Sequence, residues 1–250
     1  MEDSTIVNLI PETFDRLIRA THHDPFSILG RHPQDEDVVV RAFIPEASDV
    51  RIEGRDGDLP MERRFETAFF EWQGSADAVP HRYRLSWTDA HGTRHRQYDP
   101  YCFPEALGDF DLHLFSEGRH RHAYRFLGAR PYSIDGVEGV LFATWAPNAE
   151  RVSVVGDFNQ WDGRRHPMRN RGGGGIWELF LPGIGPGTLY KFELRGRDGA
   201  IHIKSDPYGR RFELRPATAA LVDSPDRHQW KDAAWMQERR HADWLHSAMA

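Results

Sequence analysis

A twelve-residue motif occurs twice in this chain, as FIPEASDVRIEG at residues 43–54 and as WAPNAERVSVVG at residues 145–156. The two copies share proline, alanine, valine and glycine at matching positions, 102 residues apart. The second copy ends in a β-branched run at 151–155 that stops at Gly156, which is typical of a strand entering a turn. Because similarity at a fixed spacing is the signature of repeated units, the motif predicts two copies of one β-rich domain.

The correspondence between the two copies continues at a spacing of 107 residues. The further matches are Pro60-Met61 with Pro167-Met168, Phe70-Glu71 with Trp177-Glu178, and Asp99-Pro100-Tyr101 with Asp206-Pro207-Tyr208. The spacing changes because the second copy holds five more residues between Gly156 and Pro167, where the segment DFNQWDG (157–163) lies. We therefore expect function in this surface loop, since related scaffolds differ most in the loops that carry function.

Short runs of β-branched and aromatic residues, separated by glycine, proline and asparagine, indicate an all-β protein. The clearest runs are residues 38–43, 151–155, 176–181 and 189–194. Together with the repeat, they predict two tandem immunoglobulin-like β-sandwiches. Helix signals are confined to the two ends, over residues 8–20 and 226–249. The expected domains are a helical segment at 1–21, a first sandwich at 22–117, a second sandwich at 118–223 and a helical linker at 224–250.

The composition argues against several classes of partner. The 250 residues include 32 lysines and arginines and 38 aspartates and glutamates, a net charge of −6. No nucleic acid or membrane partner is expected, because both favour a positive field. The single cysteine, Cys102, cannot form an intramolecular disulfide and fits a reducing compartment. No apolar run reaches the roughly 20 residues of a membrane span, and the acidic N-terminus does not resemble a signal peptide. We therefore expect a soluble, cytoplasmic protein.

The loop at residues 157–163 has the composition of a sugar-binding surface. An indole offers a flat face to the C–H side of a glucose ring, while amide, ammonium and carboxylate groups bond the hydroxyl rim. The residues expected to contact a glycan are Trp161, Asn159 and Lys191, with Trp177 as a further candidate. The alternative interpretation is structural: Phe158 and Trp161 cap the edge of the sandwich, and Asn159 and Asp162 close an Asx turn.

Several motifs are, as a set, specific for one family. They are His22-His-Asp-Pro-Phe26, Trp145-Ala-Pro-Asn-Ala149, Gly156-Asp-Phe-Asn-Gln-Trp-Asp-Gly163, Arg165-His-Pro-Met168, Leu189-Tyr-Lys191, Ser205-Asp-Pro-Tyr208 and Leu214-Arg-Pro216. Over residues 8–250 the chain resembles bacterial 1,4-α-glucan (glycogen) branching enzymes. The resemblance implies two N-terminal β-sandwiches, the second a family 48 carbohydrate-binding module. It also implies that the helical tail leads into a catalytic (β/α)₈ barrel of the α-amylase superfamily.

The reaction that the resemblance implies cleaves an α-1,4 bond and reattaches the fragment as an α-1,6 branch. Its carboxylates belong to the barrel, which needs about 250 residues of its own. We therefore expect this chain to be the non-catalytic N-terminal part, and we assign it no catalytic residue. Its expected partners are α-glucan and the catalytic barrel. Two alternatives stay open: a purely structural pair of domains that binds no sugar, and an independent glycogen-targeting module.

No cofactor and no metal site are expected. The histidines at 22–23 and at 120 and 122 lack the cysteine or carboxylate partners of a metal site. The glycines at 172–175 are not followed by the lysine of a phosphate loop, so we expect a hairpin connection there. The serine and cysteine motifs of nucleophilic catalysis do not occur either.

The chain departs from the family pattern at two places. Related modules carry a second tryptophan after the later Asp-Gly turn, whereas Asp198-Gly199 is followed here by AIHI at 200–203. The first sandwich has no counterpart of the FNQW loop. We therefore expect one aromatic platform, at Trp161. The tail tryptophans Trp230, Trp235 and Trp244 are expected to pack on the barrel, because a large exposed apolar surface usually meets a partner.

Overall fold

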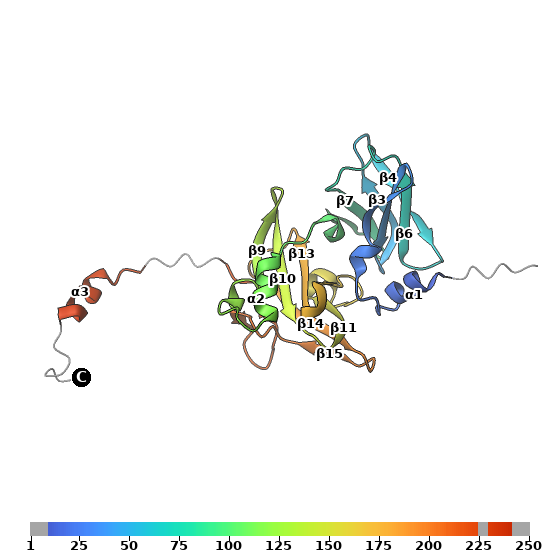
Figure 1. Ribbon diagram of the computed structural model, residues 1–250. Coiled ribbons are helices and arrows are strands. Elements are labelled where there is room, and N and C mark those ends of the chain that lie inside the picture. The colour runs from blue at the N-terminus through green and yellow to red at the C-terminus, as the bar shows by residue number, and fades with distance from the viewer. Residues whose placement is uncertain (1–9, 225–229, 242–250) are drawn as a thin grey trace, which may run out of the picture.

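The computed structural model of this protein describes residues 10–224 and 230–241. Its strands form four antiparallel sheets, which are arranged as two β-sandwiches (Figure 1). In Figure 1 the first sandwich is blue to cyan, and the second runs from green to orange. This architecture confirms the predicted all-β fold with two β-sandwich domains.

The first sandwich packs two four-stranded sheets around one core. One sheet has the order β1 (Gly30–Gln34), β2 (Asp37–Phe43), β6 (Phe69–Gly74) and β5 (Glu62–Arg64); the other has the order β4 (Asp58–Pro60), β3 (Ala47–Glu53), β7 (Arg84–Asp89) and β8 (Arg94–Tyr98). Side chains alternate along the strands, so Ile52 and Leu85 point into the core. Arg51 precedes Ile52 in sequence and Ser86 follows Leu85, so both point toward the outer face of the sheet.

The second sandwich repeats most of this plan, without a strand equivalent to β4 and with two strands that the first sandwich lacks. One sheet has the order β12 (Arg169–Asn170), β13 (Ile176–Pro182), β10 (Val137–Trp145) and β9 (Gly128–Ile134); the other has the order β11 (Ala149–Val155), β14 (Leu189–Gly196), β17 (Ala220–Leu221) and β16 (Arg211–Phe212), with β15 (Ile201–Lys204) paired to β14. Val154, Tyr190 and Phe192 point into the core. Lys191 and Glu193 therefore point toward the outer face of β14.

The pairing registers confirm the internal repeat. Val50 of β3 lies opposite Trp87 of β7, and the equivalent residues Val152 of β11 and Leu194 of β14 also lie opposite each other. A register shift interrupts both strand pairs at the same place in the repeat. The pair β2 and β6 matches the pair β10 and β13 in the same way. The five additional residues therefore enter the loop after Gly156 and leave the registers of β11 with β14 and of β10 with β13 equivalent to those of the first sandwich.

Two glycines occupy equivalent tight positions in the repeat. Gly30 and Gly128 have φ angles of +91° and +98°, in a region that residues with a Cβ rarely adopt. A Cβ atom on Gly30 would lie 2.6 Å from the carbonyl oxygen of Tyr101, and one on Gly128 would lie 3.2 Å from that of Tyr208. Each glycine thus lets the first strand of its sandwich approach the Asp-Pro-Tyr segment closely.

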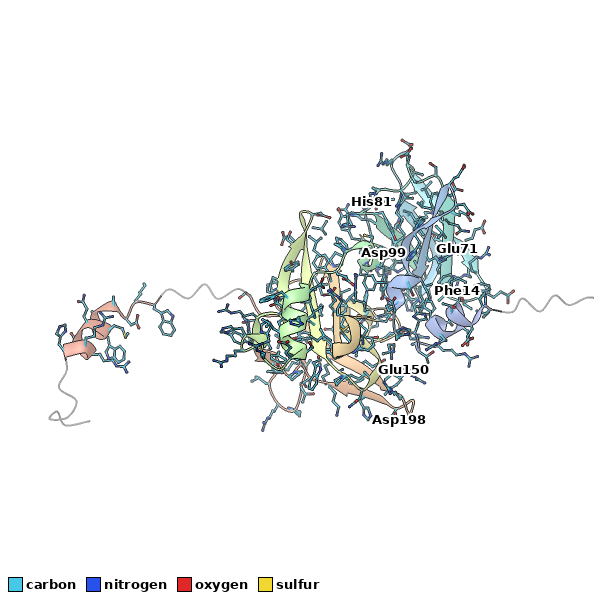
Figure 2. The ribbon with its side chains drawn as sticks, viewed as in Figure 1. Phe14, Glu71, His81, Asp99, Glu150 and Asp198 are labelled. Carbon is cyan, nitrogen blue, oxygen red and sulfur yellow. The ribbon has the colours of Figure 1, made fainter. Side chains whose placement is uncertain are left out.

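Each Asp-Pro-Tyr segment buries an aspartate. The hydroxyl of Tyr83 donates to Asp99, and that of Tyr190 donates to Asp206 at 2.6 Å. Both carboxylates also accept the backbone N–H two residues later, which forms a turn at each position. Burial raises the pKa of Asp99 to about 6 and also raises that of Asp206. Figure 2 shows Asp99 on the side of the first sandwich that faces the second.

The described residues contain three α-helices, α1 (Glu12–Ile18), α2 (Asp109–Ser116) and α3 (Ala233–His241), and the short 3₁₀ turns η1 (Pro25–Ser27), η2 (Pro100–Cys102), η3 (Ala123–Arg125), η4 (Asp157–Asn159) and η5 (Gly172–Gly174). α1 and α3 fall within the end segments expected to be helical. Parts of those segments, at 8–9, 226–229 and 242–249 with Trp244, lie outside the described residues. α2 corrects the expectation that helices are confined to the ends. None of the described helices is long and apolar enough to cross a membrane.

The segment between β8 and β9 packs against the second sandwich. Phe103 lies edge-on to Phe180 of β13, with ring centroids 4.8 Å apart. Glu178 of β13 is buried and accepts hydrogen bonds from the backbone N–H groups of Ala106 and Leu107, at 3.2 and 2.9 Å. The connecting segment therefore covers one face of β13 with both apolar and polar contacts. The domain boundary expected between residues 117 and 118 stays a prediction.

Side chains also join the two sandwiches directly. Arg165 forms an ion pair with Glu46 at 2.8 Å. The hydroxyl of Tyr101 donates to the carbonyl oxygen of Pro167 at 3.2 Å. These contacts connect the loop that follows β11 in the second sandwich with residues of the first.

Candidate functional site

The loop after β11 forms a tight turn that carries Trp161. Gln160 and Trp161 have φ angles of +56° and +61°, and the backbone N–H of Trp161 donates to the carbonyl of Gly156 at 2.9 Å. The indole Nε1–H donates to Oδ1 of Asp157 at 2.8 Å. The nitrogen edge of the ring is therefore fixed, while the side chain is only partly buried. The structure places Trp161 at the surface.

Asn159 lies inside this loop rather than on its surface. Its side chain is fully buried. Oδ1 accepts the backbone N–H of Gly156 at 2.9 Å, and Nδ2 donates to the carbonyl of Val154 and to Nδ1 of His166, both at 2.9 Å. Both the oxygen and the nitrogen of the Asn159 amide are therefore already hydrogen-bonded within the loop, and these are the atoms that would have to bond a sugar hydroxyl. Contrary to the sequence-based expectation, Asn159 therefore positions the loop and does not face a ligand.

His166 is the buried partner of this asparagine. Burial, with a further contribution from the adjacent Arg165 charge, lowers the pKa of His166 to about 3. The imidazole is consequently neutral near pH 7, and its Nδ1 can accept the Asn159 amide. The loop keeps this hydrogen bond over the pH range in which exposed histidines gain a proton.

Lys191 lies on the outer face of β14, beside the base of the loop. It pairs across the strands with Val155, the last residue of β11 before the loop begins. Its Nζ donates to Oγ1 of Thr218 at 2.8 Å. Because the Trp161 loop also covers the outer face of β14, at Glu193, the structure brings Lys191 and this loop to one face of the second sandwich.

Trp177 belongs to the core of the second sandwich. It is 1 % exposed, and its Nε1–H donates to the carbonyl of Ala146 at 3.0 Å. Every residue of β13 is buried, because the core lies on one side of the strand and the connecting segment on the other. The expectation that Trp177 contacts a glycan is therefore corrected: its ring is a packing element.

An ion pair that was not predicted from the sequence lies beneath the loop. Arg151 of β11 is 2 % exposed and pairs with Glu193 of β14, and its Nη1 also donates to the carbonyl of Gly163. A Cβ on Gly163 would lie 2.0 Å from a carboxylate oxygen of Glu193, so the loop rests directly on the pair. Strand alternation could have placed Arg151 on the outer face, but its partner depends on the register between β11 and β14.

Both carboxylates of the loop are engaged by neighbours. Asp157 accepts the indole N–H, and Asp162 pairs with Arg164 at 2.6 Å. Burial alone would raise the pKa of Asp162, but hydrogen bonds from Arg164 lower it overall. An ionised carboxylate cannot protonate a leaving group as a glycosidase acid does. Across residues 10–224 and 230–241, no group of three or more histidine, cysteine or carboxylate side chains could hold a metal ion.

The strand beside β14 presents aliphatic side chains where a second stacking tryptophan would stand. Figure 2 shows Asp198 at the tip of the β14–β15 hairpin. After this turn, Ile201 and Ile203 of β15 are 54 % and 52 % exposed. The site therefore has one aromatic platform, and the strand next to β14 offers an apolar surface.

Comparisons with known proteins match each sandwich to a family. Residues 10–101 match the family described as alpha-1,4-glucan branching enzyme GlgB, N-terminal domain. Residues 126–209 match Carbohydrate-binding module 48 (Isoamylase N-terminal domain). The Trp161 loop and Lys191 both lie within the second match.

The chain is also similar over its whole length to curated proteins named 1,4-alpha-glucan branching enzyme GlgB. The relative from Methylococcus capsulatus is 54 % identical over 250 residues, which are 100 % of this chain and 33 % of the relative. The relative from Nitrosococcus oceani is 53 % identical over 96 % of this chain and 32 % of its own length. This chain thus spans about a third of the length of these relatives.

Among solved structures, pullulanase type I from Bacillus subtilis str. 168, complexed with maltose, aligns with 80 % of this chain and 27 % of the pullulanase. The identity is 18 % and the TM-score is 0.35. A score this low does not establish a shared arrangement of domains.

Proposed function

We propose that the second sandwich of this chain binds α-glucan at Trp161 and Lys191, as part of the N-terminal region of a 1,4-alpha-glucan branching enzyme of the GlgB type. The observation that carries this proposal is the geometry of the Trp161 loop. Two positive φ angles and the bond from the indole nitrogen to Asp157 hold a partly exposed ring in one orientation before any ligand arrives. A ligand therefore loses little affinity to the ordering of this side chain.

The two residues supply complementary parts of sugar recognition. The Trp161 ring stacks against the apolar C–H face of a glucose unit, since indole combines a large apolar surface with a fixed polar edge. An ammonium group has three N–H donors, and Lys191 uses one of them on Thr218. The other two can donate to hydroxyl groups at the rim of the sugar.

For the whole enzyme, we propose that the sandwiches hold an α-glucan chain for a catalytic barrel that cleaves an α-1,4 bond and forms an α-1,6 branch. The barrel would pack against the second sandwich at exposed apolar side chains such as Ile201, Ile203 and Trp145. Exposed apolar side chains favour packing against another apolar surface. The free thiol of Cys102 supports a cytoplasmic location, where thiols stay reduced.

The test of glycan binding is native gel retardation in glycogen, comparing the parent chain with Trp161→Ala. We expect the parent to be retarded and Trp161→Ala to bind roughly tenfold more weakly or worse, as when a stacked tryptophan is removed from a contact. The matched control is Trp145→Ala. Trp145 is 52 % exposed in the same sandwich, at the end of β10, and should leave retardation unchanged.

Equal mobility of the parent and Trp161→Ala, with both chains folded, would contradict the binding proposal. The structural alternative would then stand, in which both sandwiches support a catalytic barrel and bind no sugar. The observation that favours this second function is the exposure of Ile201 and Ile203, aliphatic residues on β15 beside the candidate site.

A further inference from the structure

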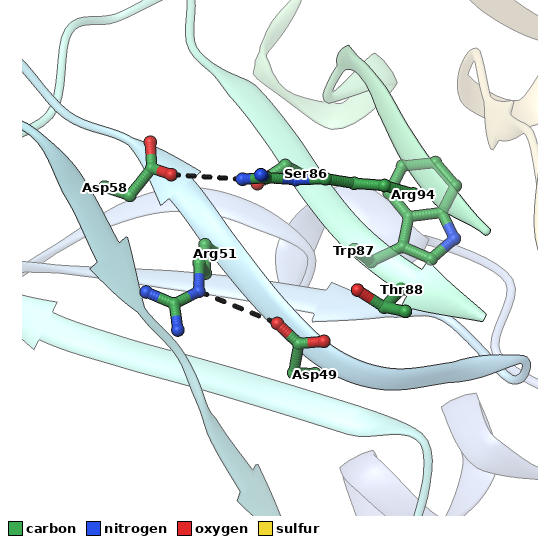
Figure 3. Close-up of a pocket in the computed structure, with 7 residues that line it drawn as sticks. All are labelled: Asp49, Arg51, Asp58, Ser86, Trp87, Thr88 and Arg94. Carbon is green, nitrogen blue, oxygen red and sulfur yellow. Dashed lines mark hydrogen bonds and ion pairs between the residues drawn. The ribbon is translucent and has the colours of Figure 1, made fainter. Parts of the chain in front are cut away.

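A pocket of about 340 Å³ lies on the outer face of the first sandwich, at strands β3, β4, β7 and β8 (Figure 3). Its charged lining residues are Asp49, Arg51, Asp58 and Arg94, and the hydroxyl residues Ser86 and Thr88 of β7 lie between them. The volume falls within the range of small-ligand sites, which starts at about 300 Å³.

The internal repeat explains why this face is open. In the second sandwich the equivalent face carries the buried pair of Arg151 and Glu193, which the Trp161 loop covers at Gly163. Asp49 and Ser86 occupy the corresponding positions in the first sandwich. The loop after β3 is five residues shorter there, and within the part of the chain that the structure describes these two residues line a pocket instead. The pocket is therefore the counterpart of a covered surface in the other copy.

Ser86 contributes a polar group that lacks a partner. Its side chain is 4 % exposed, and among the described residues its Oγ makes no hydrogen bond although it is buried. Leu85 and Trp87, on either side of it in sequence, both belong to the core, so Ser86 points toward the pocket. A buried hydroxyl without a partner costs about 1–3 kcal/mol. A ligand that bonds this hydroxyl would remove the cost.

Two solvent-exposed ion pairs line the pocket, and Figure 3 shows them as two separate dashed contacts. Arg51 lies 3.6 Å from Asp49, and Arg94 lies 3.4 Å from Asp58. The side chains of these four residues are 42–69 % exposed. Exposed pairs of this kind contribute little free energy, so their N–H groups and carboxylate oxygens can exchange partners with a ligand at small cost.

We propose that this pocket is a second α-glucan site, on the first sandwich, that binds a short segment of the neutral chain. The pocket offers two guanidinium groups as hydrogen-bond donors and two carboxylates as acceptors. This set complements sugar hydroxyls, which both donate and accept hydrogen bonds. Because two arginines face two aspartates, the formal charge of the pocket is zero and gives no preference for an anionic ligand. The choice of α-glucan among neutral polyols rests on the proposed function.

Two sites on adjacent sandwiches have a consequence for polymeric substrates. A glycogen particle presents many chain segments, so binding at one site raises the effective concentration of sugar at the other. Each site can then be weak for a short oligosaccharide while the whole chain holds the polymer firmly. The second site thus adds affinity for polymer without requiring an exposed tryptophan.

The test is an NMR titration of the full 250-residue chain with maltoheptaose, following the backbone amides of Ser86 and Thr88. We expect saturable shifts at both amides in the parent and also in Trp161→Ala, because the two sites are separate. Arg51→Ala should weaken the binding reported by these amides by roughly tenfold, the loss expected when a charged hydrogen-bond donor is removed. Asp58→Asn should also weaken the binding that these amides report, and this variant replaces Arg51→Ala in the test if Arg51→Ala does not fold.

The matched control for Arg51 is Arg64→Ala. Arg64 is 45 % exposed and lies 3.6 Å from Glu62, which matches Arg51 at 46 % exposure and 3.6 Å from Asp49. Arg64 has Glu71 as a further partner at 3.7 Å and belongs to β5 in the opposite sheet. Its replacement should leave the shifts unchanged. Absence of shifts at Ser86 and Thr88, even where amides near Trp161 respond, would overturn this inference alone. A response to glucose 1-phosphate but not to maltoheptaose would overturn it too.

Discussion

Among single residues, Asn159 governs whether Trp161 can act as a platform. Its amide bonds the N–H of Gly156 and the carbonyl of Val154. The carbonyl of the same Gly156 accepts the backbone N–H of Trp161. The tryptophan therefore depends on a buried asparagine that never reaches the surface. Glycan contact and loop positioning are divided between two residues of the same short motif.

Replacement of this asparagine should unfold the loop before it affects the core. Asn159→Ala leaves the Gly156 N–H and the Val154 carbonyl without their side-chain partner, and we expect a loss of about 2–3 kcal/mol in the free energy of unfolding. Urea denaturation measures this loss. Asn148→Ala is the matched control, because Asn148 is exposed, and it should change stability by no more than about 0.5 kcal/mol. Equal stability of the two variants would contradict the positioning role.

From the sequence, the surface loop that forms the candidate sugar site could be predicted better than the residues of the site that are exposed. Trp161 and Lys191 lie at the surface, but Asn159 and Trp177 do not. An asparagine in a polar loop suits a sugar and a backbone amide equally well, so its residue type could not separate the two roles. Trp177 lies in a strand buried on both faces, where alternation gives no sign of orientation.

Among the elements, the loop after β11 acts as a lid on the outer face of its own sheet. It covers the pair of Arg151 and Glu193 through a glycine that leaves no space for a side chain. The insertion of five residues was visible in the spacing of the repeat. What it covers was not visible, because that depends on which residues of β11 and β14 lie opposite each other.

A methyl group on this glycine should disturb the pair beneath it. In Gly163→Ala the new Cβ would meet the Glu193 carboxylate, which must move away from the buried Arg151. Because breaking a buried pair is costly, we expect a loss of about 2–3 kcal/mol in the free energy of unfolding. Thermal or urea denaturation checks it. Gly173→Ala, where a Cβ would meet nothing within 4 Å, is the control, and a loss as large there would refute the steric explanation.

The internal helix α2 shows where reading of local patterns was insufficient. Its eight residues include acidic Asp109 and Asp111 in the first turn, which favour a helix N-terminus. Its apolar residues Leu112 and Phe115 are only partly buried and pack on the second sandwich. Because the helix is short and its apolar residues show little helical periodicity, its packing on the second sandwich stabilises it more than its own sequence does.

For the whole molecule, the two copies of the repeat form separate cores that are joined by the segment after β8. Phe103 and Leu107 of this segment lie in one apolar cluster with Phe126 and Phe180 of the second sandwich. The repeat predicted two cores, since equivalent strands pair in equivalent registers. It could not predict this cluster, because the connecting segment has no counterpart within the first sandwich.

Removal of the Phe103 ring should uncouple the two sandwiches. Phe103 is 3 % exposed and contacts Phe180 at a centroid distance of 4.8 Å, so Phe103→Ala should cost about 3–5 kcal/mol. Phe103 also contacts Tyr98 of β8 and Arg82, but it does not belong to the apolar core of the first sandwich. The loss therefore falls mainly on the junction and the second sandwich. Scanning calorimetry should therefore show the second sandwich melting earlier, as a transition separate from that of the first.

Phe110→Ala is the matched control, because Phe110 lies in the same segment but is 72 % exposed. This variant should give the same calorimetric trace as the parent. If Phe103→Ala instead lowered a single, undivided transition, the two cores would unfold as one unit, and the connecting segment would be part of a shared core rather than a joint between two.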